Sequence, residues 1–156
     1  MADLTKLDPT LRADFEQSIA DFEREHPTLP RPVLDCGYRS PALQNATYAQ
    51  GRQPLATVNA LRKAAGADPI SAADAAQKVT WAQGGQSAHN YLPSPAGDIK
   101  FIDAHGNCDW HDALFHLFAT YMLRNPAVEW GGHFPAGKTD LPHFQRKGWL
   151  QLVHHV

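Results

Sequence analysis

The chain has 156 residues, of which 43% are apolar and 19% are charged, and its formal net charge is −2. This length and composition are ordinary for one globular domain, so we expect a single domain over residues 1–156. No basic stripe stands out, which argues against nucleic acid as a partner. No stretch approaches the roughly 20 apolar residues of a membrane span. We therefore expect no membrane span. We also expect a monomer.

The first residues and the cysteines bear on where the protein is made. The segment MADLTKLDPTLRADF has no basic region followed by an apolar run, so we expect synthesis in the cytoplasm without a signal peptide. Cys36 and Cys108 lie outside any CxxC pair. Two buried thiols are the simplest expectation. A disulfide between them is the alternative, although a domain of this size does not depend on one.

The N-terminal segment predicts an amphipathic helix. Asp8 suits the N-cap position with Pro9 at the first helical position, and the helix should end near His26. Its apolar residues recur at steps of three and four, namely Leu11, Phe15, Ile19 and Phe22. This spacing places one apolar stripe along the helix.

A short strand and a second helix should follow. Residues 32–36 indicate a strand after a proline-rich turn, and Ser40 suits the N-cap of a helix that starts at Pro41 and runs to about Gln50. Residues 52–80 are rich in alanine. We expect this segment to be an excursion from the core with one or two short helices.

The second half of the chain predicts a small sheet and one more helix. Strands are expected at residues 97–102, 128–130 and 141–146. A helix is expected over residues 109–123, with Trp110 in its apolar set. This order of elements predicts an α+β fold, a small antiparallel sheet with packed helices.

Two short segments carry the residues with the most chemical interest. His89 and Asp98 are nine residues apart, and two prolines between them exclude a regular helix. We therefore expect a loop that can bring His89 back beside Asp98. Downstream, Asp140 precedes His143 by three residues. In an extended strand, His143 and Gln145 would face the same side.

These residues suit a catalytic zinc site. Such a site uses three protein ligands and keeps one position open for water. His89, Asp98 and His143 are the candidate ligands of Zn²⁺, and Asp140 is the candidate general base. On spacing alone, Asp98 could instead cap a turn and Asp140 could form an Asx-turn, because the pattern lacks a compact signature such as HExxH.

Four motifs in the same order resemble the zinc D-Ala-D-Ala carboxypeptidase and L-alanyl-D-glutamate endopeptidase family, especially its phage-endolysin branch. They are GYRS with a following glutamine and YAQGR (37–40, Gln44, 48–52), SxH with AxD (87–89, 96–98), EWGG (129–132) and DxPHF (140–144). The motif-bearing core covers about residues 33–146. The loop between His89 and Asp98 is longer than in many members and carries two prolines.

Like the spacing, the resemblance implies metal ligands at His89, Asp98 and His143. It also implies a catalytic carboxylate at Asp140. It also implies that Arg39 helps to hold the substrate or the oxyanion, although Arg39 could simply pair with an acid. Ser87 and Trp130 are further candidates for substrate binding. The alternatives are a loop hydrogen bond for Ser87 and a core position for Trp130.

The implied function is hydrolysis of an amide bond in the peptidoglycan stem peptide. The small size, the lack of a signal peptide and the YAQGR and DLPHFQ motifs favour an L-alanyl-D-glutamate endopeptidase of the endolysin type. A D-alanyl-D-alanine carboxypeptidase is the alternative among enzymes, and a non-catalytic module that binds zinc or cell wall is the alternative outside them. We expect action on the cell wall after release through a holin or another route.

Overall fold

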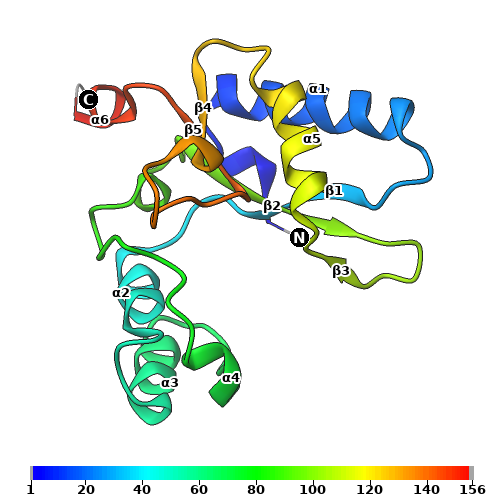
Figure 1. Ribbon diagram of the computed structural model, residues 1–156. Helices are drawn as coiled ribbons and strands as arrows, with labels where there is room; N and C mark the ends of the chain where they lie inside the picture. Colours follow the sequence, from blue (N-terminus) through cyan, green and yellow to red (C-terminus); the bar gives the residue numbers. More distant parts are fainter. Residues whose placement is uncertain (1, 155–156) are drawn as a thin grey trace. The chain divides into compact units, whose positions relative to one another are not determined.

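A computed structural model of the chain describes residues 2–154 and divides into two compact units. The first unit runs up to Tyr38 and continues from Leu92, and the second comprises Arg39–Tyr91 (Figure 1). The expected excursion at residues 52–80 lies inside the second unit. None of the described helices is long and apolar enough to cross a membrane.

The first unit contains an antiparallel sheet, and the predicted α+β class is confirmed. Its described strands are β1 (Arg31–Cys36), β2 (Ala96–Ile102), β3 (Cys108–Asp109), β4 (Val128–Trp130) and β5 (His143–Arg146). The order is β1-β2-β5-β4, and β3 also pairs with β2. Strand β1 therefore lies along one edge of β2, while β5 and β3 share the other edge at opposite ends of the strand.

The first unit also contains helices and short 3₁₀ turns. Among the described residues of the first unit they are α1 (Pro9–Glu25), α5 (Asp112–Met122), α6 (Trp149–His154), η1 (Leu4–Lys6) and η3 (Gly131–His133). Helix α1 begins where the sequence predicts, because the Asp8 carboxylate accepts hydrogen bonds from the backbone N–H groups of Thr10 and Leu11 at 3.0 and 3.2 Å.

The core lies between the sheet and helices α1 and α5. Phe22 of α1 contacts Phe101 of β2 and Phe118 of α5, with ring centroids 5.7 and 5.9 Å apart. All three side chains are fully buried. A Cβ on Gly97 would lie 2.8 Å from the ring of Phe15, so glycine allows α1 to pack closely on β2. The core face of β2 therefore carries residues 97, 99 and 101.

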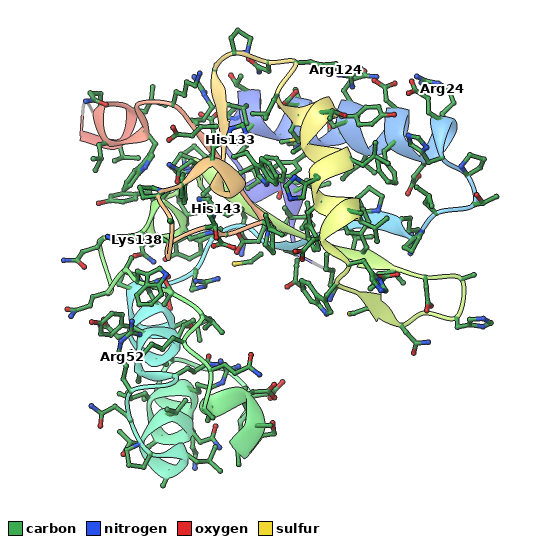
Figure 2. All side chains as sticks on the ribbon, in the orientation of Figure 1. Arg24, Arg52, Arg124, His133, Lys138 and His143 are labelled. Atoms are coloured by element: carbon green, nitrogen blue, oxygen red, sulfur yellow. The ribbon has the colours of Figure 1, made fainter. Side chains whose placement is uncertain are left out.

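An ion-pair cluster joins the ends of α1 and α5. The buried carboxylate of Asp21 accepts a hydrogen bond from Arg124 at 2.8 Å and pairs with Arg24 at 2.7 Å. Figure 2 labels both arginines at this end of the unit. These hydrogen bonds, with Arg124 contributing most, hold the pKa of Asp21 below its usual value.

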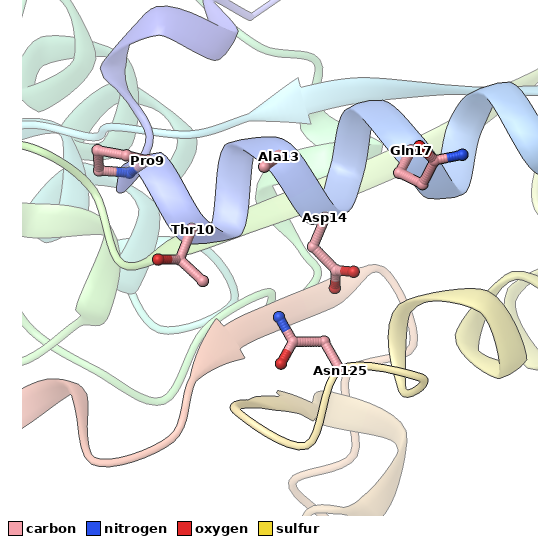
Figure 3. Close-up of a pocket in the computed structure, with 6 residues that line it drawn as sticks. All are labelled: Pro9, Thr10, Ala13, Asp14, Gln17 and Asn125. Carbon is pink, nitrogen blue, oxygen red and sulfur yellow. The ribbon is translucent and has the colours of Figure 1, made fainter.

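A pocket with polar lining residues is found beside α1 (Figure 3). It is lined by Pro9, Thr10, Ala13, Asp14, Gln17 and Asn125, so it contains none of the predicted site residues. Burial raises the pKa of Asp14 to about 6, against the opposing charge of Arg124. One oxygen of this carboxyl is buried and has no hydrogen-bond partner among the described residues.

Three expectations for the first unit were wrong in detail. The helix expected over residues 109–123 begins at Asp112, because Cys108–Asp109 pair with β2 as a strand. Trp110 precedes that helix, is 53% exposed and stacks on Phe115. The strand expected from residue 141 begins at His143, and α6 was not predicted.

The cysteines form no disulfide, and Cys108 is exposed, contrary to the expectation of two buried thiols. Cys36 is opposite Asp98 on one edge of β2, whereas Cys108 is opposite Ile102 on the other edge. Four residues of strand span about 13 Å, and the two edges add a further separation. This exceeds the roughly 7 Å between Cα atoms that a disulfide can bridge.

The second unit is helical in its described residues, with α2 (Pro41–Ala49), α3 (Leu55–Ala64), α4 (Ala72–Ala75) and η2 (Ala88–Asn90). The predicted cap of α2 is confirmed, since Ser40 Oγ accepts from the N–H of Leu43 at 3.1 Å. Beyond α2, Gly51 adopts a φ of 72° and approaches the backbone of Lys78 closely. One or two short helices were expected within residues 52–80, and two are present, α3 and α4.

Candidate metal centre

Four polar side chains lie on the face of the sheet opposite α1 and α5, which we call the site face. Because side chains alternate along a strand, Asp98 faces away from the core between Gly97 and Ile99. On β5, Phe144 is buried in the core, so His143 and Gln145 face the other way. The register places Asp98 opposite His143, and Glu129 of β4 opposite Gln145.

Asp98 and His143 are placed as two ligands of one ion would be. Asp98 Oδ1 lies 2.9 Å from His143 Nδ1. Oxygen and nitrogen ligands each lie about 2.0–2.2 Å from zinc, so two of them in a tetrahedral site are expected about 3.4 Å apart, and a small outward shift of Asp98 and His143 would reach that separation. The carboxylate of Asp140 joins this group, since one ligand atom from each of the three residues lies within 4.8 Å of the others. This donor set suits a zinc ion.

Asp140 and His143 are held together by the backbone. The N–H of Asp140 donates to the carbonyl of Gly131 at 3.0 Å, and the N–H of His143 donates to the carbonyl of Asp140 at 3.2 Å. A Cβ on Gly131 would overlap the Asp140 carbonyl oxygen and lie 3.0 Å from His143 Cβ. The first glycine after β4 therefore allows the segment that carries the candidate base to pack against η3.

The second unit brings together Arg39, Ser87 and His89. The N–H of Arg39 donates to the carbonyl of His89 at 2.8 Å, and Ser87 Oγ accepts from the N–H of His89 at 3.2 Å. Asn90 adds a hydrogen bond from its side-chain amide to the carbonyl of Arg39 at 2.8 Å. The His89 residue is 3% exposed. The loop hydrogen bond considered for Ser87 is therefore present, and its contact with substrate stays a prediction.

Gln44 has a role at Arg39 that sequence reasoning did not assign. Its side-chain oxygen accepts from the Arg39 guanidinium at 2.9 Å, and its amide nitrogen donates to Thr80 and to the carbonyl of Ala82. Gln44 is fully buried, so it fixes the direction of the Arg39 side chain within the unit. The available signal was its place in the motif that begins at Gly37.

Trp130 belongs to the core of the first unit. It is 4% exposed, stacks with Phe144 at 6.3 Å and donates from Nε1 to the carbonyl of Leu141 at 2.7 Å. Exposed His133, labelled in Figure 2, packs edge-on against the same indole. The core position was the alternative for Trp130, and a direct substrate contact stays a prediction.

Glu129 and Gln145 are further site-face residues that the sequence-based site did not include. Gln145 Nε2 donates to Glu129 Oε1 at 2.6 Å, and Gln145 Oε1 lies 2.8 Å from His143 Nε2. Glu129 is the first residue of EWGG and Gln145 directly follows DxPHF, but their pairing depends on the β4–β5 register. The ring of His143, labelled in Figure 2, is thus contacted at both nitrogens.

Comparisons with known proteins assign no family to this chain. A scan of the sequence against protein-family models found no match, and a search among curated proteins found none either. The interpretation of the site therefore rests on its geometry and on the motifs in the sequence.

Proposed function

We propose that this chain is a zinc-dependent peptidase that hydrolyses an amide bond of the peptidoglycan stem peptide, as an L-alanyl-D-glutamate endopeptidase of the endolysin type. The observation that carries the proposal is the 2.9 Å approach of Asp98 Oδ1 to His143 Nδ1 with the Asp140 carboxylate in the same group. A carboxylate and an imidazole that converge in this way, next to a second carboxylate, suit a hydrolytic metal centre.

Asp98 and His143 would hold the zinc ion, and His89 is proposed as the third ligand on the SxH and AxD motifs. A bound zinc would supply a Lewis acid that polarises the scissile carbonyl and makes water more acidic. Asp98 lies in β2, so the sheet fixes the position of this proposed ligand.

Asp140 is proposed as the general base and then the general acid. Its carboxylate would accept a proton from the attacking water and later donate it to the nitrogen of the leaving amine. Support comes from the hydrogen bond that fixes its backbone to Gly131 and from its place beside His143. A base held in this way needs little reorganisation during the reaction.

Arg39 is proposed to stabilise the negative charge that develops on the scissile carbonyl oxygen, or to hold a substrate carboxylate. A guanidinium is always charged and can donate two parallel hydrogen bonds to either group. Support comes from Gln44, which accepts from one nitrogen of Arg39 and restricts its motion. Such preorganised donors make large contributions to catalysis.

The test is digestion of purified peptidoglycan with and without a chelator, with the products identified by mass spectrometry. New L-alanine carboxyl and D-glutamate amino ends that disappear with chelator and return with zinc would support the endopeptidase. Free D-alanine would instead assign a D,D-carboxypeptidase. A protein that binds zinc and wall but cleaves nothing would be the non-catalytic module, and the proposal would be wrong.

Two histidine variants make the ligand assignment specific. His89→Ala should lose zinc and all cleavage, because a three-ligand site loses most of its affinity with one ligand removed. His105→Ala is the matched control, since His105 is exposed in the turn between β2 and β3. Equal zinc content in the two variants would contradict His89 as a ligand.

A further inference from the structure

Three contacts connect four side chains in a row across the site face. Glu129 Oε1 is 2.6 Å from Gln145 Nε2, Gln145 Oε1 is 2.8 Å from His143 Nε2, and His143 Nδ1 is 2.9 Å from Asp98 Oδ1. Two of these pairs, Glu129 with Gln145 and Asp98 with His143, lie directly opposite each other on paired strands. The row is therefore set by the register of β2, β5 and β4.

Glu129 sets which atom donates and which accepts in each hydrogen bond of the row. An ionised carboxylate only accepts hydrogen bonds, so the amide nitrogen of Gln145 must face it. The amide oxygen of Gln145 is then left to accept from His143, which places the ring proton on Nε2. A neutral imidazole has one N–H group, so the Nδ1 lone pair points at Asp98 Oδ1. With the proton on Nε2, Nδ1 and Asp98 Oδ1 are two acceptors 2.9 Å apart, an arrangement that a shared metal ion would stabilise.

Gln145 alone could not impose this pattern of donors and acceptors. The oxygen and the NH₂ group of an amide have nearly the same shape, so the side chain could turn over. Its NH₂ group would then donate to Nε2 of His143, and the ring proton would move to Nδ1. That proton would occupy the lone pair that faces Asp98 and would compete with a metal ion.

We propose that Glu129, acting through Gln145, is a positioning residue that holds His143 in the tautomer with its proton on Nε2 and its Nδ1 available to the metal. This inference rests on the proposed zinc function. Neither Glu129 nor Gln145 is proposed to touch the ion or the substrate. Removing a partner that orients a metal-bound histidine commonly lowers the affinity for the metal by about 10- to 100-fold.

The test compares wild-type protein with Glu129→Gln, Gln145→Met and Asp35→Asn. Glu129→Gln keeps the shape of the side chain and a hydrogen bond to Gln145. It no longer fixes the orientation of the Gln145 amide, since an amide can donate as well as accept. Gln145→Met removes the acceptor for His143. Asp35→Asn is the control, because it neutralises a carboxylate that pairs with Lys100 on the same sheet and leaves the row intact.

Zinc affinity is measured by competition with a fluorescent chelator, and two-bond ¹H–¹⁵N spectra of the zinc-loaded proteins report which nitrogen of His143 carries the proton. The expected results are a proton on Nε2 in wild type, and affinity lowered by about 10- to 100-fold in Glu129→Gln and Gln145→Met but not in Asp35→Asn. Circular dichroism checks folding, and Gln145→Met carries the test should Glu129→Gln not fold.

A wild-type proton on Nδ1, or unchanged zinc affinity in a folded Glu129→Gln or Gln145→Met variant, would overturn the positioning role. These readouts do not depend on cleavage. The variants could show the expected zinc affinities while the wild-type protein cuts no peptide. That result would contradict the proposed peptidase and leave the positioning role in place.

Discussion

Replacing Gly131 with alanine tests the geometry of the site through one added methyl group. The new Cβ would overlap the carbonyl oxygen of Asp140 and lie 3.0 Å from His143 Cβ. A carbon and a carbonyl oxygen normally stay about 3.3 Å apart, so the Asp140 carbonyl must move by about 1 Å. That carbonyl also accepts from the N–H of His143, so the movement reaches both the proposed base, Asp140, and the proposed ligand, His143.

A displacement of about 1 Å in a catalytic group can lower the rate by about 100-fold. Overpacking a close contact costs about 1–3 kcal/mol of unfolding free energy. We therefore expect Gly131→Ala to lower kcat/KM by about 100-fold, weaken zinc binding and lower stability within that range. The assays are stem-peptide hydrolysis, chelator competition and denaturant unfolding.

Gly137→Ala is the matched control for this prediction. Gly137 also lies between β4 and β5, and a Cβ there would meet nothing within 4 Å. Its φ of 83° makes alanine cost about 1–2 kcal/mol through left-handed strain alone. We expect lower stability with near-normal kcat/KM. Wild-type activity and zinc affinity in Gly131→Ala would refute the reasoning, as would an equal loss of activity in Gly137→Ala.

Three further predictions concern the proposed base, a half-buried carboxyl and the core. Asp140→Asn should keep zinc, measured by metal analysis, and lower kcat by about 10²- to 10⁴-fold in the peptide assay. Burial raises the pKa of Asp14 from 3.8 to about 6, so its ionisation disfavours the folded state as pH rises through that window. Asp14→Asn should thus raise unfolding free energy at about pH 7.5, by at most about 2 kcal/mol for this half-buried group, with no gain near pH 3.5 in denaturant titrations. Phe118→Ala should lower unfolding free energy by about 3–5 kcal/mol at either pH, because its ring is fully buried against Phe22 and Phe144.

Local signals in the sequence predicted the elements that begin with a cap. Asp8 before Pro9 and Ser40 before Pro41 placed the starts of α1 and α2, because side-chain capping acts within a few residues. The two-residue strand β3 was missed, since its pairing with Phe101 and Ile102 is a tertiary contact. Trp110 was misplaced for the same reason.

The sequence predicted the residue types of the candidate site better than the hydrogen bonds between them. Alternation along the chain placed His143 and Gln145 on one side, and the structure confirms this. The contact of Gln145 with Glu129 could not be predicted, because it depends on how β4 is aligned with β5. The hydrogen bond between Gln44 and Arg39 likewise depends on the packing of the second unit.

The division of β2 between two partners has a consequence for protein engineering. Asp98 lies where β5 pairs with β2, whereas the turn after β2 leads into β3 at the opposite end. Five residues of strand put Asp103 about 17 Å from Asp98. The exposed tip at residues 104–107 is therefore a suitable point to insert a wall-targeting module, because loop tips of this kind tolerate fused domains. A chimaera built there would carry the added domain far from Asp98 and would leave unchanged every strand that supports the site face.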